Sequence, residues 1–257
     1  MMVLAHGRSA CRGMIVPLVV LALAGLMAPQ GTPRALDEPA PALESGTGSL
    51  HGVVRLGRHL TERRMRFSLY PDTGPAAPLP APTDPAAELA NVVVFLEDAP
   101  GLRGAGAAPA GPFRMEQQRQ AFLPHVLPVI VGSAVEFPNG DPIYHNVFSL
   151  SKASSFDLGR YPKGSTRVIT FDRPGVVKVF CHIHSDMSAV VMVMPHAFFT
   201  SPGSQGAYRL TGIPPGRYTV TGWHERARPL QREVLIEAGA DVVMNLDIPI
   251  EDPADGR

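Results

Sequence analysis

Six short apolar segments between residues 126 and 194 are separated by turn-forming residues, and this pattern limits the chain to folds built from strands. Glycine and proline mark the turns, as in NGDP at 139–142 and PG at 174–175. Several short strands at this spacing are typical of a β-sandwich or barrel, so we predict an all-β protein. The predicted strands are 126–131, 134–138, 146–150, 167–171, 176–181 and 189–194.

The charge composition argues against some classes of partner. Acidic and basic residues balance at 23 each, so no net field favours nucleic acid or an anionic membrane surface. The 25 glycines and 27 prolines suit short strands and turns better than a helical bundle, and the proline-rich segment 71–88 predicts a loop. No P-loop or GxSxG motif is present, and no small-molecule substrate is evident from the sequence.

The N-terminal segment has the pattern of an export signal. Arg8 and Arg12 form a basic lead, and the apolar run that follows ends at Ala28 among small residues. That run is shorter than the roughly 20 apolar residues of a membrane span. We therefore expect a signal peptide at 1–28, a linker at 29–47 and a periplasmic protein. An uncleaved N-terminal membrane anchor is the alternative.

Cysteine usage makes one residue stand out. Removal of the leader takes Cys11 with it and leaves Cys181 as the single cysteine of the mature protein. A lone thiol outside the cytoplasm is open to oxidation unless it is buried or bound to a metal. Cys181 is therefore a candidate metal ligand.

Soft and borderline metal-binding side chains gather around this cysteine. Cys181, His184 and Met187 follow one another at intervals of three residues, and His145 lies 36 residues before the cysteine. Thiolate and thioether suit copper(I), and imidazole suits copper(II) as well, so the set fits one copper ion. The alternatives are a structural zinc site, an empty site of the same fold, or a cysteine and a methionine that serve only as core.

Three motifs extend the pattern beyond these four side chains: FPN at 137–139, HNVF at 145–148, and PGVVKVFC at 174–181. Together with the two-residue spacings after the cysteine, they resemble the cupredoxins, the family of plastocyanin and amicyanin. The short ligand loop looks like that of amicyanin. The resemblance covers residues 113–196 and implies a Greek-key β-sandwich.

The resemblance also implies a role for each motif residue. His145, Cys181 and His184 would be the equatorial ligands of a type 1 (blue) copper ion, and Met187 the axial ligand. Asn146 would tie the two ligand loops together through hydrogen bonds.

The implied function is one-electron transfer with redox partner proteins, without enzymatic activity. A docking patch would surround His184, with Pro138, Pro142 and Met187 as its candidates. His182 is expected on the outer face and not as a ligand. A copper carrier or sensor is the second hypothesis, and a surface interaction protein with a cupredoxin scaffold is the third.

The C-terminal segment has a different pattern. GAYRL at 206–210 and IPPGRYTV at 213–220 resemble carboxypeptidase regulatory-like domains, which are transthyretin-like β-sandwiches. The tail alone offers few strands for a core of its own, so we predict that it combines with strands near the N-terminus. The predicted domains are a discontinuous sandwich of 48–100 and 197–250, a linker at 101–112, and the cupredoxin-like segment at 113–196.

Overall fold

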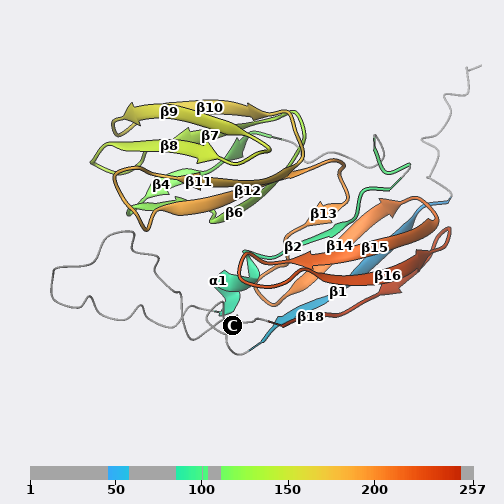
Figure 1. The fold of residues 1–257 in the computed structure, drawn as a ribbon. Helices are drawn as coiled ribbons and strands as arrows, with labels where there is room; N and C mark the ends of the chain where they lie inside the picture. The colour runs from blue at the N-terminus through green and yellow to red at the C-terminus, as the bar shows by residue number, and fades with distance from the viewer. Residues whose placement is uncertain (1–45, 58–84, 100, 104–110, 250–257) are drawn as a thin grey trace, which may run out of the picture. The chain divides into compact units, whose positions relative to one another are not determined.

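The structure is a computed structural model that describes residues 46–57, 85–99, 101–103 and 111–249 (Figure 1). These residues fall in one compact unit. The predicted signal peptide, most of the linker after it and a further strand that alternation predicts at 66–70 lie outside the described residues. Within the described ranges, no helix has the length and apolar character that crossing a bilayer requires.

The all-β prediction is confirmed, because among the described residues the only helix is the five-residue α1 (Pro85–Leu89). Strands β1 (Gly48–Leu56) and β2 (Val93–Leu96) precede the segment that holds β3 to β12. The remaining strands follow it: β13 (Phe199–Thr200), β14 (Ala207–Ile213), β15 (Gly216–Trp223), β16 (Leu230–Ile236), β17 (Asp241–Val243) and β18 (Leu246–Ile248).

Strands from both ends of the described chain form what we call the flanking sandwich. One sheet has the order β14-β1-β17, with β18 also paired to β1, and the other has the order β13-β2-β15-β16. Alternate residues of β1 are buried, as expected for a strand with one face on a core. Leu50, Val94, Leu96 and Val220 are among the side chains that fill the space between the sheets.

The middle of the chain forms the central sandwich. One sheet has the order β6-β12-β11-β8-β9, the other has the order β10-β7-β3, and β4 and β5 form a separate hairpin. The bounds are β3 (Phe113–Arg114), β4 (Glu116–Gln118), β5 (Ala121–Leu123), β6 (Val126–Ile130), β7 (Ser133–Pro138), β8 (His145–Leu150), β9 (Ser155–Tyr161), β10 (Thr166–Phe171), β11 (Gly175–Phe180) and β12 (Ser188–Met194).

The core of the central sandwich reaches the ends of β8 and β11. Phe137, Val147, Val179 and Cys181 belong to one buried cluster that also contains Met187. β12 is buried on both faces, because Val190, Met192 and Met194 belong to a further cluster with residues of β2, β6 and β13. Two-sided burial explains why this strand is a continuous apolar run rather than an alternating one.

Two elements illustrate where the structure departs from the sequence prediction. β9 was not predicted, because Asp157, Gly159 and Arg160 interrupt its apolar character, and it lies at the edge of its sheet with most residues exposed or half-buried. The last residues of the predicted loop at 71–88 belong to α1, whose Glu88 is buried and bonded to other residues.

The strand pairings bear on the predicted discontinuous sandwich. β2 pairs with β13 and β15, and β1 pairs with β14, β17 and β18, so strands from both sides of the central segment share sheets. Among the described residues, these strands and β3–β12 lie in separate sheets. The division into domains at residues 100 and 197 stays a prediction.

Candidate metal centre

Two neighbouring strands bring the first two predicted ligands together. β8 begins at His145, and β11 ends at Phe180, directly before Cys181. The two strands are antiparallel neighbours, with Phe180 opposite Phe148. The start of one strand therefore lies beside the end of the other, which brings residues 36 apart in sequence to the same edge of the sheet.

The loop between β11 and β12 returns the third ligand to the same place. The amide of Cys181 donates to the carbonyl of Met187 at 3.1 Å, and the amide of Met187 donates to the carbonyl of His184 at 3.0 Å. These bonds close the loop over a short distance, so three-residue spacing turns His184 back toward the cysteine.

The donor atoms of these three residues form a small triangle. His145 Nδ1 and His184 Nδ1 are 3.1 Å apart, and they lie 3.8 and 3.7 Å from Cys181 Sγ. His145 is fully buried, Cys181 is 5% exposed and His184 is half-buried. In the part of the chain that the structure describes, this is the one group of histidine, cysteine and acidic side chains close enough to hold a metal.

The triangle has the size that a bound transition metal requires. The point equidistant from its three corners lies about 2.1 Å from each of them. Protein nitrogen and sulfur ligands bind metals such as zinc at about 2.0–2.3 Å, so one ion reaches all three atoms without a rearrangement. Two imidazoles and one thiolate are also the donor set of trigonal blue-copper sites. The residues therefore fit the predicted group.

Met187 lies in the same buried cluster as Cys181 and is 1% exposed. Backbone hydrogen bonds link Met187 directly to both Cys181 and His184. Met187 is the residue that supplies the thioether of this loop.

Asn146 connects the two segments that carry the ligands. Its Oδ1 accepts a hydrogen bond from the amide of His182 at 2.7 Å, and its amide nitrogen lies 3.3 Å from Asp157 Oδ1. The residue is 2% exposed. This bond joins the start of β8 to the ligand loop, which is the tie that the resemblance implies for Asn146.

His182 does not join the donor triangle. Its ring stacks on that of Phe148, with centroids 3.8 Å apart, and the residue is exposed. The imidazole next to the cysteine therefore packs on the outside of β8.

Sequence reasoning missed Asp141. Its Oδ2 lies 2.8 Å from His145 Nε2, the ring nitrogen that faces away from the triangle. The sequence places Asp141 before a proline in a turn, and turn formation alone accounts for an aspartate there. The only available signal was the position of a carboxylate four residues before a candidate ligand.

The electrostatic surroundings keep His184 suited to metal binding. Burial, followed by the neighbouring His145, lowers the pKa of His184 below its ordinary value. A lowered pKa favours the neutral imidazole, which is the form that binds a metal.

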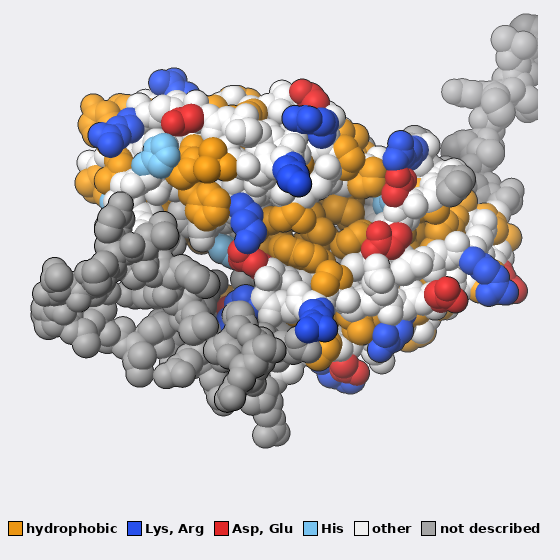
Figure 2. All heavy atoms as spheres, viewed as in Figure 1, with side chains coloured by type: hydrophobic (Ala, Val, Ile, Leu, Met, Phe, Trp, Pro, Cys, Tyr) orange, Lys and Arg blue, Asp and Glu red, His pale blue; other side chains and the backbone are white. Residues whose placement is uncertain are grey.

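The predicted docking patch needs a correction. Pro138 and Met187 are buried, and Met187 belongs to the core cluster of the central sandwich, so neither side chain is available at the surface. Pro142 is exposed, as are Ile143, Tyr144 and Ile183, whose exposed fractions are 39%, 58% and 43%. Figure 2 shows a histidine beside hydrophobic side chains over the region of β8, and positive and negative side chains interspersed over the face drawn.

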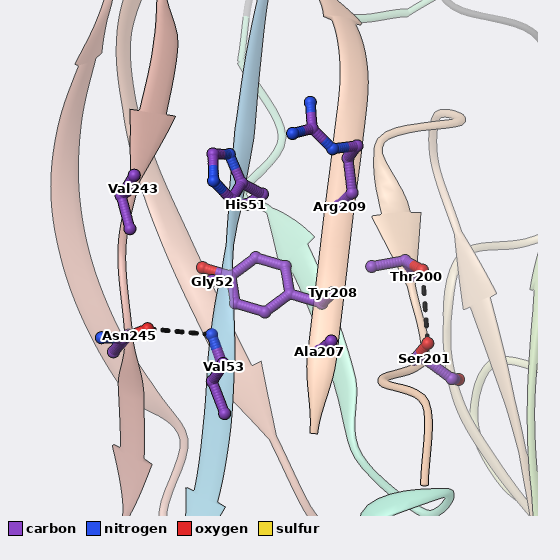
Figure 3. Close-up of a pocket in the computed structure, with 10 residues that line it drawn as sticks. All are labelled: His51, Gly52, Val53, Thr200, Ser201, Ala207, Tyr208, Arg209, Val243 and Asn245. Atoms are coloured by element: carbon purple, nitrogen blue, oxygen red, sulfur yellow. Dashed lines mark hydrogen bonds between the residues drawn. The ribbon is translucent and has the colours of Figure 1, made fainter. Parts of the chain in front are cut away.

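A cavity of about 620 Å³ lies on the flanking sandwich, where β1, β14 and β17 meet (Figure 3). The ring of Tyr208 lies over β1 next to Gly52, and its hydroxyl donates to the carbonyl of Met244 at 2.7 Å. Asn245 accepts a hydrogen bond from the amide of Val53 at 2.9 Å.

The charged groups at this cavity are paired as well. Arg209 and His51 both contact Asp241, at 3.2 and 3.0 Å. These polar side chains bond to other residues of the flanking sandwich. The donor triangle is therefore the better candidate for a functional site.

No protein-family model and no curated protein matches the chain. Solved structures similar to part of it include a reduced amicyanin mutant, at 23% identity over 33% of this chain and 83% of that one, with a TM-score of 0.31. A purple cupredoxin from Nitrosopumilus maritimus matches at 21% identity over 32% of this chain and 100% of that one, with a TM-score of 0.30.

A copper-containing nitrite reductase from Thermus scotoductus SA-01 matches at 26% identity and a TM-score of 0.32, over 44% of this chain and 27% of that one. These likenesses are partial, so the metal centre stands on its own donor-atom geometry. In part of its length, the chain is similar to cupredoxins.

Proposed function

We propose that this protein is a type 1 copper protein that carries single electrons, with His145, Cys181 and His184 as equatorial ligands and Met187 as the axial one. The observation that carries the proposal is the triangle of donor atoms with edges of 3.1, 3.7 and 3.8 Å. We propose that it works outside the cytoplasm, as an electron carrier for redox partner proteins and not as an enzyme.

The donor set supports electron transfer rather than a purely structural role. Copper would supply the one-electron redox couple, and a mixture of thiolate, imidazole and thioether satisfies both of its oxidation states. The chain contributes a site assembled on two paired strands and closed by backbone bonds, so its ligands need little movement. His145 and Cys181 are shielded from water, whereas His184 is half-buried and offers the shortest route to the surface.

Copper reconstitution tests the proposal. The full chain should bind one copper(II) ion, develop the intense visible absorption of a copper–thiolate bond, and give the spin-resonance spectrum of such a site. Cys181→Ser should lose that absorption. His184→Gln should weaken binding, whereas His182→Gln should leave it intact, because that ring lies outside the triangle.

Voltammetry separates the electron carrier from a copper carrier. Fast, reversible one-electron transfer with copper retained through both oxidation states is the expected result. Rapid exchange of copper into a chelator, with slow electron transfer, would favour the copper carrier instead. A wild-type protein that stays colourless and copper-free after incubation with equimolar copper would contradict both copper functions.

Export is a separate proposal that the basic and apolar leader at 1–28 supports. Expression of the full-length chain followed by cell fractionation tests it. The expected product is a shortened chain in the periplasmic fraction, and a full-length chain in the cytosol would contradict it.

A further inference from the structure

His145 has both ring nitrogens inside the protein, and each faces a different kind of group. Nε2 lies 2.8 Å from Asp141 Oδ2, and Nδ1 faces His184 and Cys181. An ionised carboxylate can only accept hydrogen bonds, so the bond at Nε2 requires a proton on that nitrogen. In the neutral ring, Nδ1 then carries the lone pair that a metal needs.

The carboxylate of Asp141 is itself held in place by the backbone. The amide of Arg119 donates to Oδ1 at 2.6 Å, and the amide of Gln120 donates to Oδ2 at 2.8 Å. The amide of Asp141 donates in turn to Asn139 Oδ1 at 2.9 Å. Two backbone amides therefore hold the carboxylate, and the bond to Asn139 holds the backbone of Asp141 itself.

The two donating amides come from an uncommon turn. Arg119 and Gln120 connect β4 to β5 with φ values of 53° and 56°, the left-handed region that residues other than glycine seldom adopt. This conformation turns successive amides toward the same side, where Asp141 accepts both. The β4–β5 hairpin thus serves as the support of the carboxylate.

The hydrogen bonds at Asp141 are those of a carboxylate. Both carboxyl oxygens accept from backbone amides, and Oδ2 also lies 2.8 Å from His145 Nε2, although Asp141 is only 8% exposed.

We propose that Asp141 is a positioning residue of the metal centre: it fixes His145 as the Nε2–H tautomer and so directs Nδ1 at the thiol of Cys181 and the ring of His184. Carboxylates bonded to ligand histidines in this way make the imidazole a stronger donor. The negative charge also favours copper(II) over copper(I). The inference rests on the proposed function, because it assigns Asp141 as the hydrogen-bond partner of His145, one of the proposed copper ligands.

The tautomer can be measured without any copper. In the metal-free full chain, nitrogen-15 NMR of the imidazoles distinguishes a proton on Nδ1 from one on Nε2, and the spectrum of His145→Gln identifies the signals of His145. We expect a proton on Nε2 of His145. A proton on Nδ1 alone would overturn the proposal, whether or not the protein binds copper.

Asp141→Asn tests the effect of the charge on the bound metal. An asparagine still offers an oxygen to the ring but carries no charge, so copper(II) affinity should fall about 10- to 100-fold and copper(I) affinity should fall less. The reduction potential should then rise, by about 59 mV for each tenfold difference between the two losses. Asp172→Asn removes an exposed carboxylate from the same sandwich and is the matched control.

The outcomes separate the inference from the proposed function. Wild type that binds copper, with equal affinities and potentials in Asp141→Asn and Asp172→Asn, overturns the role of Asp141 and leaves the copper protein in place. Wild type that does not bind copper overturns the proposed function, and the NMR measurement still decides the tautomer. If Asp141→Asn does not fold, the wild-type tautomer alone tests the inference.

Discussion

Each of the two sandwiches buries a histidine against a carboxylate, yet only one of these pairs belongs to a candidate metal centre. In the central sandwich, Asp141 accepts from His145 at 2.8 Å. In the flanking sandwich, Glu88 lies 3.2 Å from His224 Nε2, and these two residues are 1% and 2% exposed. Burial and the carboxylate partner are therefore common to both pairs.

The difference lies at the second nitrogen of each ring. His224 Nδ1 accepts a hydrogen bond from the amide of Arg226 at 3.1 Å, so both nitrogens are used inside the flanking sandwich. Arg226 also places its guanidinium 3.8 Å from Glu88 Oε1, which compensates the buried negative charge. His145 instead directs Nδ1 at a thiol and a second imidazole. A buried histidine is thus a metal-ligand candidate when its second nitrogen faces other donors.

Removing each histidine should give opposite results, and this is the largest expected effect. His145→Gln should weaken copper(II) binding more than about 100-fold, because it removes a ligand rather than an outer partner. His224→Gln should leave copper binding unchanged and lower the free energy of unfolding by about 1–3 kcal/mol, since it disturbs a buried bonded carboxylate. Isothermal titration and urea unfolding measure the two effects. Copper affinities that fall alike in both variants would remove the distinction between the two pairs.

Two buried asparagines give a smaller and sharper comparison. Asn146→Ala should lower copper affinity by about tenfold, because the ligand loop loses its tie to β8. Asn91, which donates to Glu88 at 3.2 Å, is the counterpart in the flanking sandwich. Asn91→Ala should cost about 1 kcal/mol of stability without changing copper affinity. Equal copper affinities in Asn146→Ala and wild type would show that the loop keeps its geometry without this bond.

The smallest effect concerns acid stability of the flanking sandwich. Hydrogen bonds from Ser49 and Arg209 lower the pKa of Asp241 from its usual 3.8 to about 2. A depressed folded-state pKa contributes stability above about pH 4, and that contribution is lost as the pH falls through about 2. Because Asp241 is exposed, solvent screening keeps the contribution small.

Urea midpoints of wild type and Asp241→Asn measure this contribution. Wild type should be slightly more stable near neutral pH, and the two midpoints should converge as the pH falls toward 2. A difference that persists unchanged in acid would mean that the charge of Asp241 does not stabilise the flanking sandwich.

Strand positions were predictable where burial leaves a regular pattern. The predicted segment 134–138 differs from β7 by one residue at its start, and the segment 176–181 differs from β11 by one residue at each end. β9 escaped prediction because an edge strand in contact with solvent tolerates glycine and charge, so its sequence lacks the alternation that marks a strand. The alternation of apolar and polar residues reflects burial of one strand face, so a strand that is mostly exposed shows little of it.

The metal centre shows the same limit. Three of its residues stand out locally, because Cys181, His184 and Met187 lie in one short loop. His145 is 36 residues away, and only its resemblance to a known motif connected it to the loop. Asp141 had no such motif, because its partners Arg119 and Gln120 meet it through the tertiary fold alone.

X-ray absorption at the copper edge of the copper-loaded full chain tests the central claim most directly. We expect two nitrogens and one sulfur bound to copper at about 2.0–2.3 Å, with the sulfur missing in Cys181→Ser. A copper ion surrounded by nitrogen and oxygen alone in the wild type would contradict the claim that the thiol and the two imidazoles share one metal.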